Sequence, residues 1–228
     1  MKVVSIHQPQ YVPYLGYFHK IRHCDIFVHL DHVQYEIGGL QNRNKIKSKD
    51  GWQWFTLPVN GGPDTRIDQV RIDPRSNWRK KHWGTLQANY ARAPHFRKYA
   101  QTLQPLYSGS DDNQLSSVNR AFSDWAMAAL GLTTPTVLSS SLDPAGASSA
   151  MLIDLCRKLG GTHYLAGPGG RRYMDLELFA RSGIEVIWQE FHAPTYPQVY
   201  PDAGFVENLS ILDLLFSLGD GAAAVLAA

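Results

Sequence analysis

The chain has 228 residues, with 44% hydrophobic residues, 18% charged residues and a formal net charge of +2. This length is enough to bury a sizeable core, and so small a charge gives no indication of a nucleic-acid partner. No apolar run is long enough to cross a bilayer, and the first residues lack a signal-peptide pattern, so we expect a cytoplasmic protein outside the membrane. Cys24 and Cys156 each lie alone on an apolar segment. We expect two buried, reduced thiols, with a disulfide between them as the alternative.

The N-terminal segment predicts a strand, a helix and a second strand. Val3, Val4 and Ile6 form a β-branched run that ends before Pro9. Apolar residues at helical spacing follow Pro13, and the segment from Cys24 to Leu30 is again typical of a strand. Two apolar strands joined by a helix form a βαβ unit, in which the strands run parallel.

The second half repeats this alternation. Strands are predicted at 133–138, 162–166 and 184–189, with helices at 147–159 and from about 174 to 182 between them. A last helix begins at Ser210. The whole pattern predicts an α/β fold with a doubly wound, mainly parallel, Rossmann-like sheet.

The middle of the chain breaks the alternation. We expect a single domain over residues 1–228, in which residues from about 41 to 130 form a β-hairpin and a helical insertion. A turn is predicted from Ile46 to Gly51, followed by a strand at 52–59 and a half-buried strand at 67–72. Helices are predicted from Trp78, at 96–107 and at 115–130.

Polar residues follow the first two strands, where open parallel sheets bind their ligands. His7 is our candidate catalytic residue, as an acid, a base or a phosphate contact; the alternative is a histidine satisfied by backbone hydrogen bonds. The candidate substrate-binding residues of this region are Gln8, Gln10, Tyr14, Tyr17, Asp31 and Gln34.

Two later segments also follow strands and suit an anion. Glycines in the segment from Gly167 to Arg171 let the backbone approach a ligand closely, and arginine binds phosphate or carboxylate. A simple glycine turn with a solvated arginine is the alternative, and the spacing matches neither the dinucleotide fingerprint nor the P-loop. Hydroxyls after the third strand bind a phosphate or cap a helix. The candidate anion-binding residues are Ser139, Ser140, Gly167, Gly169, Gly170 and Arg171.

The polar run that precedes the hairpin turn combines donors and cations with nearby tryptophans. Such a mixture suits a sugar, a base or an acidic group, and a polar hairpin with structural tryptophans is the alternative. The candidate substrate-binding residues here are Gln41, Asn42, Arg43, Lys45 and Trp54. The histidines and cysteines lack metal-ligand spacing, so no metal site is expected.

Many of these segments resemble the WbqC-like family, whose members often lie among bacterial surface-polysaccharide genes. The similar segments are IHQPQYVPYLGYFHKI (6–21), LDHVQY, QNRNKIK, GWQWFTLPV, WRKKHW, LQANYARAPHF, SSSL, YLAGPGGRRYMD, GIEVIWQEF, YPQ and NLSILDLLF. This resemblance implies an enzyme that modifies an amino sugar or a related small molecule, by transferring an acyl or aminoacyl group.

The opening unit is also similar to nucleotidylyltransferases and pantothenate synthetases, in which a Gly-His pair begins the helix and contacts nucleotide phosphates. Gly16 and Tyr17 occupy the corresponding positions here, so the histidine is absent. An ATP-dependent ligase or nucleotidylyltransferase and a non-catalytic binding protein are therefore the alternatives. No resident cofactor is implied, and the donor is left open between a carrier-protein thioester, coenzyme A, an aminoacyl-tRNA and a free acid with ATP. The expected partners are a small-molecule substrate, such as an amino sugar or sugar nucleotide, and an acyl carrier protein.

Overall fold

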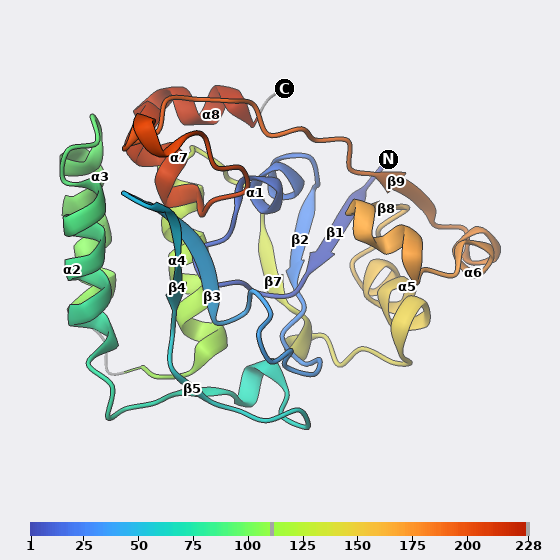
Figure 1. Ribbon diagram of the computed structural model, residues 1–228. Helices are drawn as coiled ribbons and strands as arrows, with labels where there is room; N and C mark the ends of the chain where they lie inside the picture. Colours follow the sequence, from blue (N-terminus) through green and yellow to red (C-terminus); the bar gives the residue numbers. More distant parts are fainter. Residues whose placement is uncertain (110–111, 227–228) are drawn as a thin grey trace.

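A computed structural model describes residues 1–109 and 112–226. Its central sheet has five parallel strands in the order β7-β2-β1-β8-β9 (Figure 1). The strands are β1 (Val3–His7), β2 (Ile26–His29), β7 (Thr136–Leu138), β8 (His163–Ala166) and β9 (Glu185–Trp188). The predicted α/β fold with a doubly wound, mainly parallel sheet is confirmed.

Helices cover both faces of this sheet because side chains alternate along each strand. Val4 and Ile6 of β1 pack on one face with the residues of α5 (Ser148–Lys158) and α6 (Leu176–Ser182). Val3 of β1 and Phe27 of β2 belong to the core on the other face, with α1 (Leu15–Arg22). The helix α1 is buried on nearly every side, from Leu15 to Ile21.

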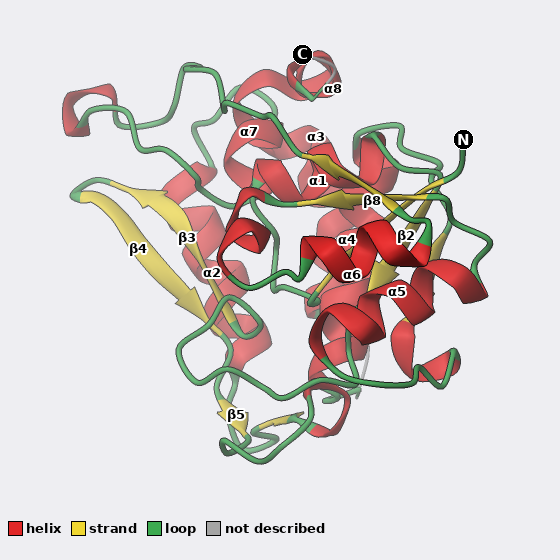
Figure 2. Ribbon diagram, turned by 90° about the vertical axis from the view of Figure 1, so that its right-hand side faces the viewer, coloured by secondary structure: helices red, strands yellow, loops and turns green. Residues whose placement is uncertain are grey.

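A long insertion lies between β2 and β7 and supplies much of the core on the α1 side of the sheet. Figure 2 shows its hairpin standing apart from the parallel sheet. The strands of the insertion are β3 (Arg43–Ser48), β4 (Gly51–Thr56), β5 (Val59–Asn60) and β6 (Arg71–Ile72), and its helices are α2 (Trp78–Tyr90), α3 (Phe96–Leu103) and α4 (Leu115–Ala129). Two helices near the C-terminus, α7 (Ile211–Leu218) and α8 (Ala222–Val225), complete the fold.

The predicted turn from Ile46 to Gly51 was too long. The strand β3 continues to Ser48, and only Lys49 and Asp50 connect it to Gly51, whose φ of 106° is accessible to glycine. The polar residues of β3 do not resemble a typical buried strand. They are tolerated there because buried polar groups find partners: Asn44, for example, donates to the carbonyl of Val12 at 3.0 Å.

Two other predictions within the insertion were also wrong in part. Residues 67–69 form a short 3₁₀ helix rather than a strand, and only Arg71–Ile72 pairs as β6. Ile67 and Val70 are both fully buried, and a spacing of three residues suits a 3₁₀ turn better than a strand. The helix predicted at 96–107 ends at Leu103, and a 3₁₀ helix containing Pro105 follows it.

A buried polar cluster joins the hairpin to the C-terminal helices. Lys47 of β3 donates its backbone N–H to the Tyr90 hydroxyl at 2.7 Å, and its ammonium donates to the Gly204 carbonyl. Tyr196 donates to Oδ2 of Asp213 at 2.9 Å, and Asp213 is fully buried on α7. Burial raises the pKa of Asp213 from 3.8 to about 6, although hydrogen bonds from Tyr196 and Tyr90 and the charge of Lys47 act in the opposite direction.

This raised pKa predicts a pH-dependent stability. Between pH 4 and pH 6 the folded protein holds a proton on Asp213 that the unfolded chain has released, so the free energy of unfolding falls as pH rises. The wild type should lose roughly 2–3 kcal/mol relative to Asp213→Asn across this window, and nothing further above it. Urea unfolding of both proteins at several pH values measures this difference. If the free energy of unfolding depended on pH in the same way in both proteins, Asp213 would not have the raised pKa.

Both cysteines are free and buried in the structure. Burial raises the pKa of the Cys24 and Cys156 thiols to about 12. Neither thiol is therefore a ready nucleophile near neutral pH.

Candidate functional site

The strand order creates a switch point between β1 and β8. From β1 the chain passes to β2 and then β7, whereas from β8 it passes to β9 on the other side. Crevices at such points, beyond the carboxyl ends of the strands, are the usual binding sites of open α/β sheets. A crevice of about 480 Å³ lies there, and its lining includes His7, Gln8, Tyr14, Lys20, Gly167, Gly169, Gly170 and Tyr173.

His7 is the last residue of β1 and lines this crevice. Its Nδ1 lies 3.0 Å from the Gln8 carbonyl oxygen, which only accepts, so Nδ1 carries a proton and donates. The ring packs edge-on against Tyr17, with 5.0 Å between ring centroids. Burial and the nearby charge of Lys20 lower the pKa of His7 to about 3. The imidazole is therefore neutral near pH 7, with an Nε2 lone pair that is free to accept a proton, and it is neither an acid nor a cationic phosphate contact. A pKa this low also makes it a weak base for as long as burial and the Lys20 charge act on it.

Lys20 is a crevice residue that the sequence analysis missed. It lies on α1 with only 3% of its surface exposed, and its ammonium donates to the Ile6 carbonyl at 3.0 Å. Burial lowers the pKa of Lys20 to about 8, so most molecules still carry this charge at neutral pH.

The glycine segment forms the wall opposite β1. Gly167, Gly169 and Gly170 line the crevice, and residues 168–172 form a short 3₁₀ helix. A Cβ on Gly170 would lie 2.7 Å from Sδ of Met174 and 3.2 Å from the Trp188 ring, so a larger residue here requires the Met174 side chain to move. The Arg171 guanidinium instead lies over the Trp188 ring, 4.2 Å from its centroid, and Arg171 does not line the crevice.

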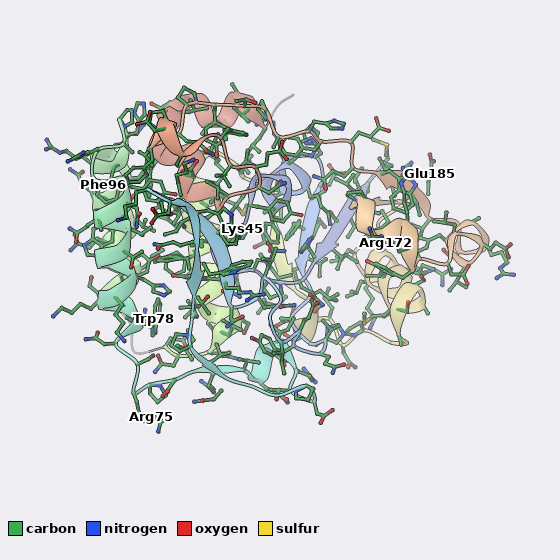
Figure 3. The ribbon with its side chains drawn as sticks, in the orientation of Figure 1. Lys45, Arg75, Trp78, Phe96, Arg172 and Glu185 are labelled. Carbon is green, nitrogen blue, oxygen red and sulfur yellow. The ribbon has the colours of Figure 1, made fainter. Side chains whose placement is uncertain are left out.

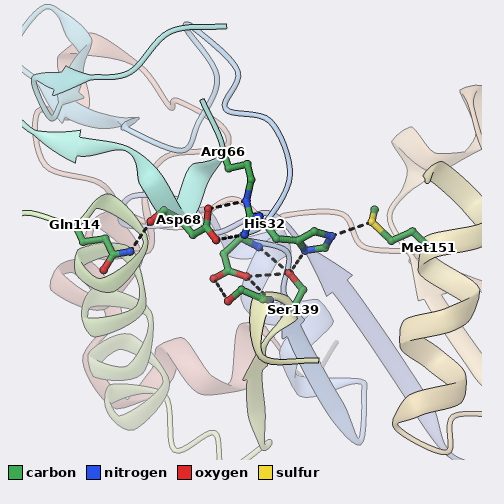
Figure 4. Close-up of polar contacts among 8 residues, drawn as sticks. His32, Arg66, Asp68, Gln114, Ser139 and Met151 are labelled. Carbon is green, nitrogen blue, oxygen red and sulfur yellow. Dashed lines mark hydrogen bonds and ion pairs between the residues drawn. The ribbon is translucent and has the colours of Figure 1, made fainter. Parts of the chain in front are cut away.

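Asp31 and the serines after β7 form a separate network (Figure 4). The Asp31 carboxylate accepts from the Ser139 hydroxyl at 2.9 Å, the Ser140 N–H at 2.9 Å and the Ser140 hydroxyl at 2.7 Å. His32 Nδ1 lies 2.6 Å from the same Ser139 hydroxyl, and its Nε2 lies 3.1 Å from Sδ of Met151. A carboxylate already occupies these donors and would repel a second anion, so these contacts favour a role in joining the ends of β2 and β7. Asp31 and Ser140 also line a hollow of about 400 Å³.

The predicted amide residues connect the crevice to the hairpin. Gln41 donates from Nε2 to Oε1 of Gln8 at 2.6 Å, and Asn119 of α4 donates to the Gln41 carbonyl at 2.7 Å. Asn42 donates to the Leu57 carbonyl at 2.9 Å. Gln10 and Gln41 are almost fully buried, and within the described residues their Oε1 atoms have no partner. Of these amides only Gln8 reaches the crevice lining.

The remaining tyrosine and glutamine candidates divide between the crevice and its surroundings. Tyr14 lines the crevice, whereas Tyr17 is fully buried, with its hydroxyl 2.9 Å from Nδ1 of His29. Gln34 is exposed and donates to the Pro63 carbonyl. It lines a neighbouring hollow of about 500 Å³, which shares Gln8 with the crevice.

The hairpin presents a cationic aromatic surface of its own. The Arg43 guanidinium lies 4.1 Å from the Trp54 ring centroid, and the Lys45 ammonium lies 4.5 Å from that of Trp52. Both tryptophans are about 40% exposed, at 41% for Trp54 and 42% for Trp52. In Figure 3, Lys45 on the hairpin and Arg172 near the glycine segment lie on opposite sides of β1 and β2. The predicted site residues thus form a crevice, a structural network and a separate hairpin surface.

Residues 1–109 and 112–226 contain neither a cluster of metal ligands nor a membrane-spanning helix. No three histidine, cysteine or acidic side chains in these ranges gather closely enough to hold a metal ion. None of the helices found there has the length and apolar character needed to span a bilayer.

The comparisons with known proteins cover nearly the whole chain. The model of the WbqC-like protein family matches residues 8–225. The uncharacterized protein Rv1507c of Mycobacterium tuberculosis (strain ATCC 25618 / H37Rv) is 36% identical over 222 residues, which are 96% of this chain and 95% of that protein. No solved structure matches. Within the crevice lining, the residues from Gln8 to Met174 lie in the matched range, whereas Ile6 and His7 lie just before it. The chain therefore belongs to the WbqC-like protein family.

Proposed function

We propose that the protein is a transferase that moves an acyl or aminoacyl group onto the amine of an amino-sugar nucleotide or a similar small amine. The reaction would serve surface-glycan or related biosynthesis. The observation that supports it best is the state of His7. This imidazole is neutral, its Nδ1 is fixed by the Gln8 carbonyl, and it lines a crevice at the switch point of the sheet.

The chemistry needs a neutral group with a free lone pair to take a proton from the attacking amine. The amine nitrogen attacks the donor carbonyl, and a C–N bond forms while the carbonyl oxygen takes up the negative charge. His7 Nε2 accepts the proton that the new ammonium must lose. As the carbonyl re-forms, the bond to the leaving group breaks, and His7 returns the proton to that group. With a thioester donor, the products are an amide and a free thiol.

The donor in this proposal is a thioester of a carrier protein or of coenzyme A, whereas a free acid activated by ATP belongs to the second candidate. No other residue is assigned to proton transfer. The crevice of about 480 Å³ is within the usual size of small-molecule sites, so it accommodates the acceptor with the reacting part of the donor.

An ATP-dependent ligase or nucleotidylyltransferase is the second candidate. It is favoured by the strand order, because switch-point crevices of this topology commonly bind nucleotides. The two candidates differ in their products, since only the second releases AMP or pyrophosphate.

Mass spectrometry of sugar nucleotides and carrier-protein intermediates, in cells with and without the gene, tests the proposal. Loss of the gene should cause an unmodified amino-sugar nucleotide to accumulate, and the purified protein should acylate that compound. An unchanged pool would count against acyl transfer. Release of AMP or pyrophosphate by the purified protein would favour the ligase.

A further inference from the structure

Lys20 is a buried cation without a buried anion to match it. Its side chain is 3% exposed, and within the described ranges it forms no ion pair with a carboxylate. Within these ranges the Lys20 ammonium makes one hydrogen bond, to the neutral Ile6 carbonyl, although it has three protons to donate. The Cys24 thiol lies near Lys20 and would carry negative charge if ionised. Burial raises its pKa to about 12, so it is neutral near pH 7.

Such an arrangement is costly when the crevice is empty. Removing an ammonium from water is unfavourable unless an opposite charge or a full set of acceptors replaces the solvent. A bound anion would supply that charge, and the interaction would be stronger in this partly enclosed site than on the surface.

The lining of the crevice bears on which anion binds. Lys20 and His7 contribute to its lining on one side, and Gly167 and Gly169 contribute on the other. A Cβ placed on Gly169 would meet nothing within 4 Å, so a side chain added at this position would not clash with the protein. Lysine is a common phosphate binder and acts as a point charge. No arginine lines the crevice among the described residues, so the bidentate contact that arginine makes with phosphate or carboxylate is absent.

We propose that Lys20 binds a phosphate group of the substrate in the crevice between β1 and β8. The inference rests on the proposed function in taking this crevice as the substrate site, and it narrows the substrates to phosphate-carrying small molecules such as sugar nucleotides. Bound phosphate would also offset the Lys20 charge beside His7, which favours proton acceptance by the imidazole.

Calorimetric titration of the full chain with inorganic pyrophosphate and with UDP tests the assignment directly. Wild-type protein should bind both, and Lys20→Met should weaken each Kd by at least about tenfold. Lys80→Met is the matched control, because Lys80 is exposed on α2 and should leave both Kd values unchanged. Malonate, a dicarboxylate, should bind far more weakly than pyrophosphate.

A second pair of variants keeps the test open if Lys20→Met does not fold. Gly169→Asp adds a negative charge where there is open space, and it should weaken pyrophosphate binding, whereas Gly169→Asn should not. Equal pyrophosphate affinity in wild type and Lys20→Met would overturn the proposal, as would malonate binding as tightly as pyrophosphate. Binding is measured without any acyl donor, so a phosphate site confirmed here stands even if acyl transfer is never observed.

Discussion

Replacing His7 with asparagine is expected to lower the turnover of the transfer reaction by a factor of about 10²–10⁴, the usual contribution of a general base. The asparagine amide can still donate to the Gln8 carbonyl, as Nδ1 of His7 does at 3.0 Å, so the loop should keep its conformation. What the variant lacks is the lone pair of Nε2. Steady-state kinetics with the amine acceptor found by mass spectrometry measures the effect.

The control is His192→Asn, because His192 is exposed outside the crevice. It should retain wild-type turnover. The pH profile gives a further check: with a His7 pKa of about 3, kcat/KM of the wild type should show no loss attributable to this histidine between pH 5 and pH 8. Full activity in His7→Asn would remove His7 from the mechanism.

Replacing Asp31 with alanine is expected to lower the free energy of unfolding by about 3–5 kcal/mol. Asp31 is 1% exposed and accepts the hydrogen bonds from Ser139 and Ser140. Without the carboxylate, the hydroxyls and the Ser140 N–H lose their acceptor inside the protein, and unpaired buried donors are costly. Urea unfolding measures the loss.

Two comparisons distinguish this structural role from substrate binding. Asp31→Asn keeps an oxygen and the side-chain shape, so it should lose less stability than the alanine variant. Asp64→Ala alters an exposed loop carboxylate and should change stability by less than about 0.5 kcal/mol. If Asp31→Ala were as stable as the wild type but bound substrate poorly, Asp31 would be a ligand contact instead.

The parallel sheet could be predicted because its signal is local. The apolar runs that form β1 and β8 are short and end at Pro9 and Gly167, so the sequence located His7 and the glycine wall at one edge. The buried role of Lys20 had no such signal. Lys20 is not one of the apolar residues at helical spacing on α1, so its sequence position predicts a solvent-exposed side chain. It is buried because α1 is packed on nearly every side.

The partners of polar side chains were also beyond local prediction. Asp31 and Ser139 are 108 residues apart, and no local pattern indicates that the Ser139 hydroxyl would donate to the Asp31 carboxylate. Arg171 follows the predicted strand, but the position of its guanidinium over Trp188 depends on where β9 lies in space. These residues were chosen for their chemistry, whereas tertiary contacts decide which of them reach the crevice.

The central position of β1 has a consequence for how the chain folds. Its two neighbours are β2, which follows closely, and β8, whose contacting residues lie 160 positions later in the sequence. Contacts this distant require closure of a very long loop, which slows folding. During synthesis, one edge of β1 stays unpaired until most of the chain has been made, and unpaired strand edges favour association with other chains. The strand that holds His7 is thus synthesised well before β8, the second of its two neighbours.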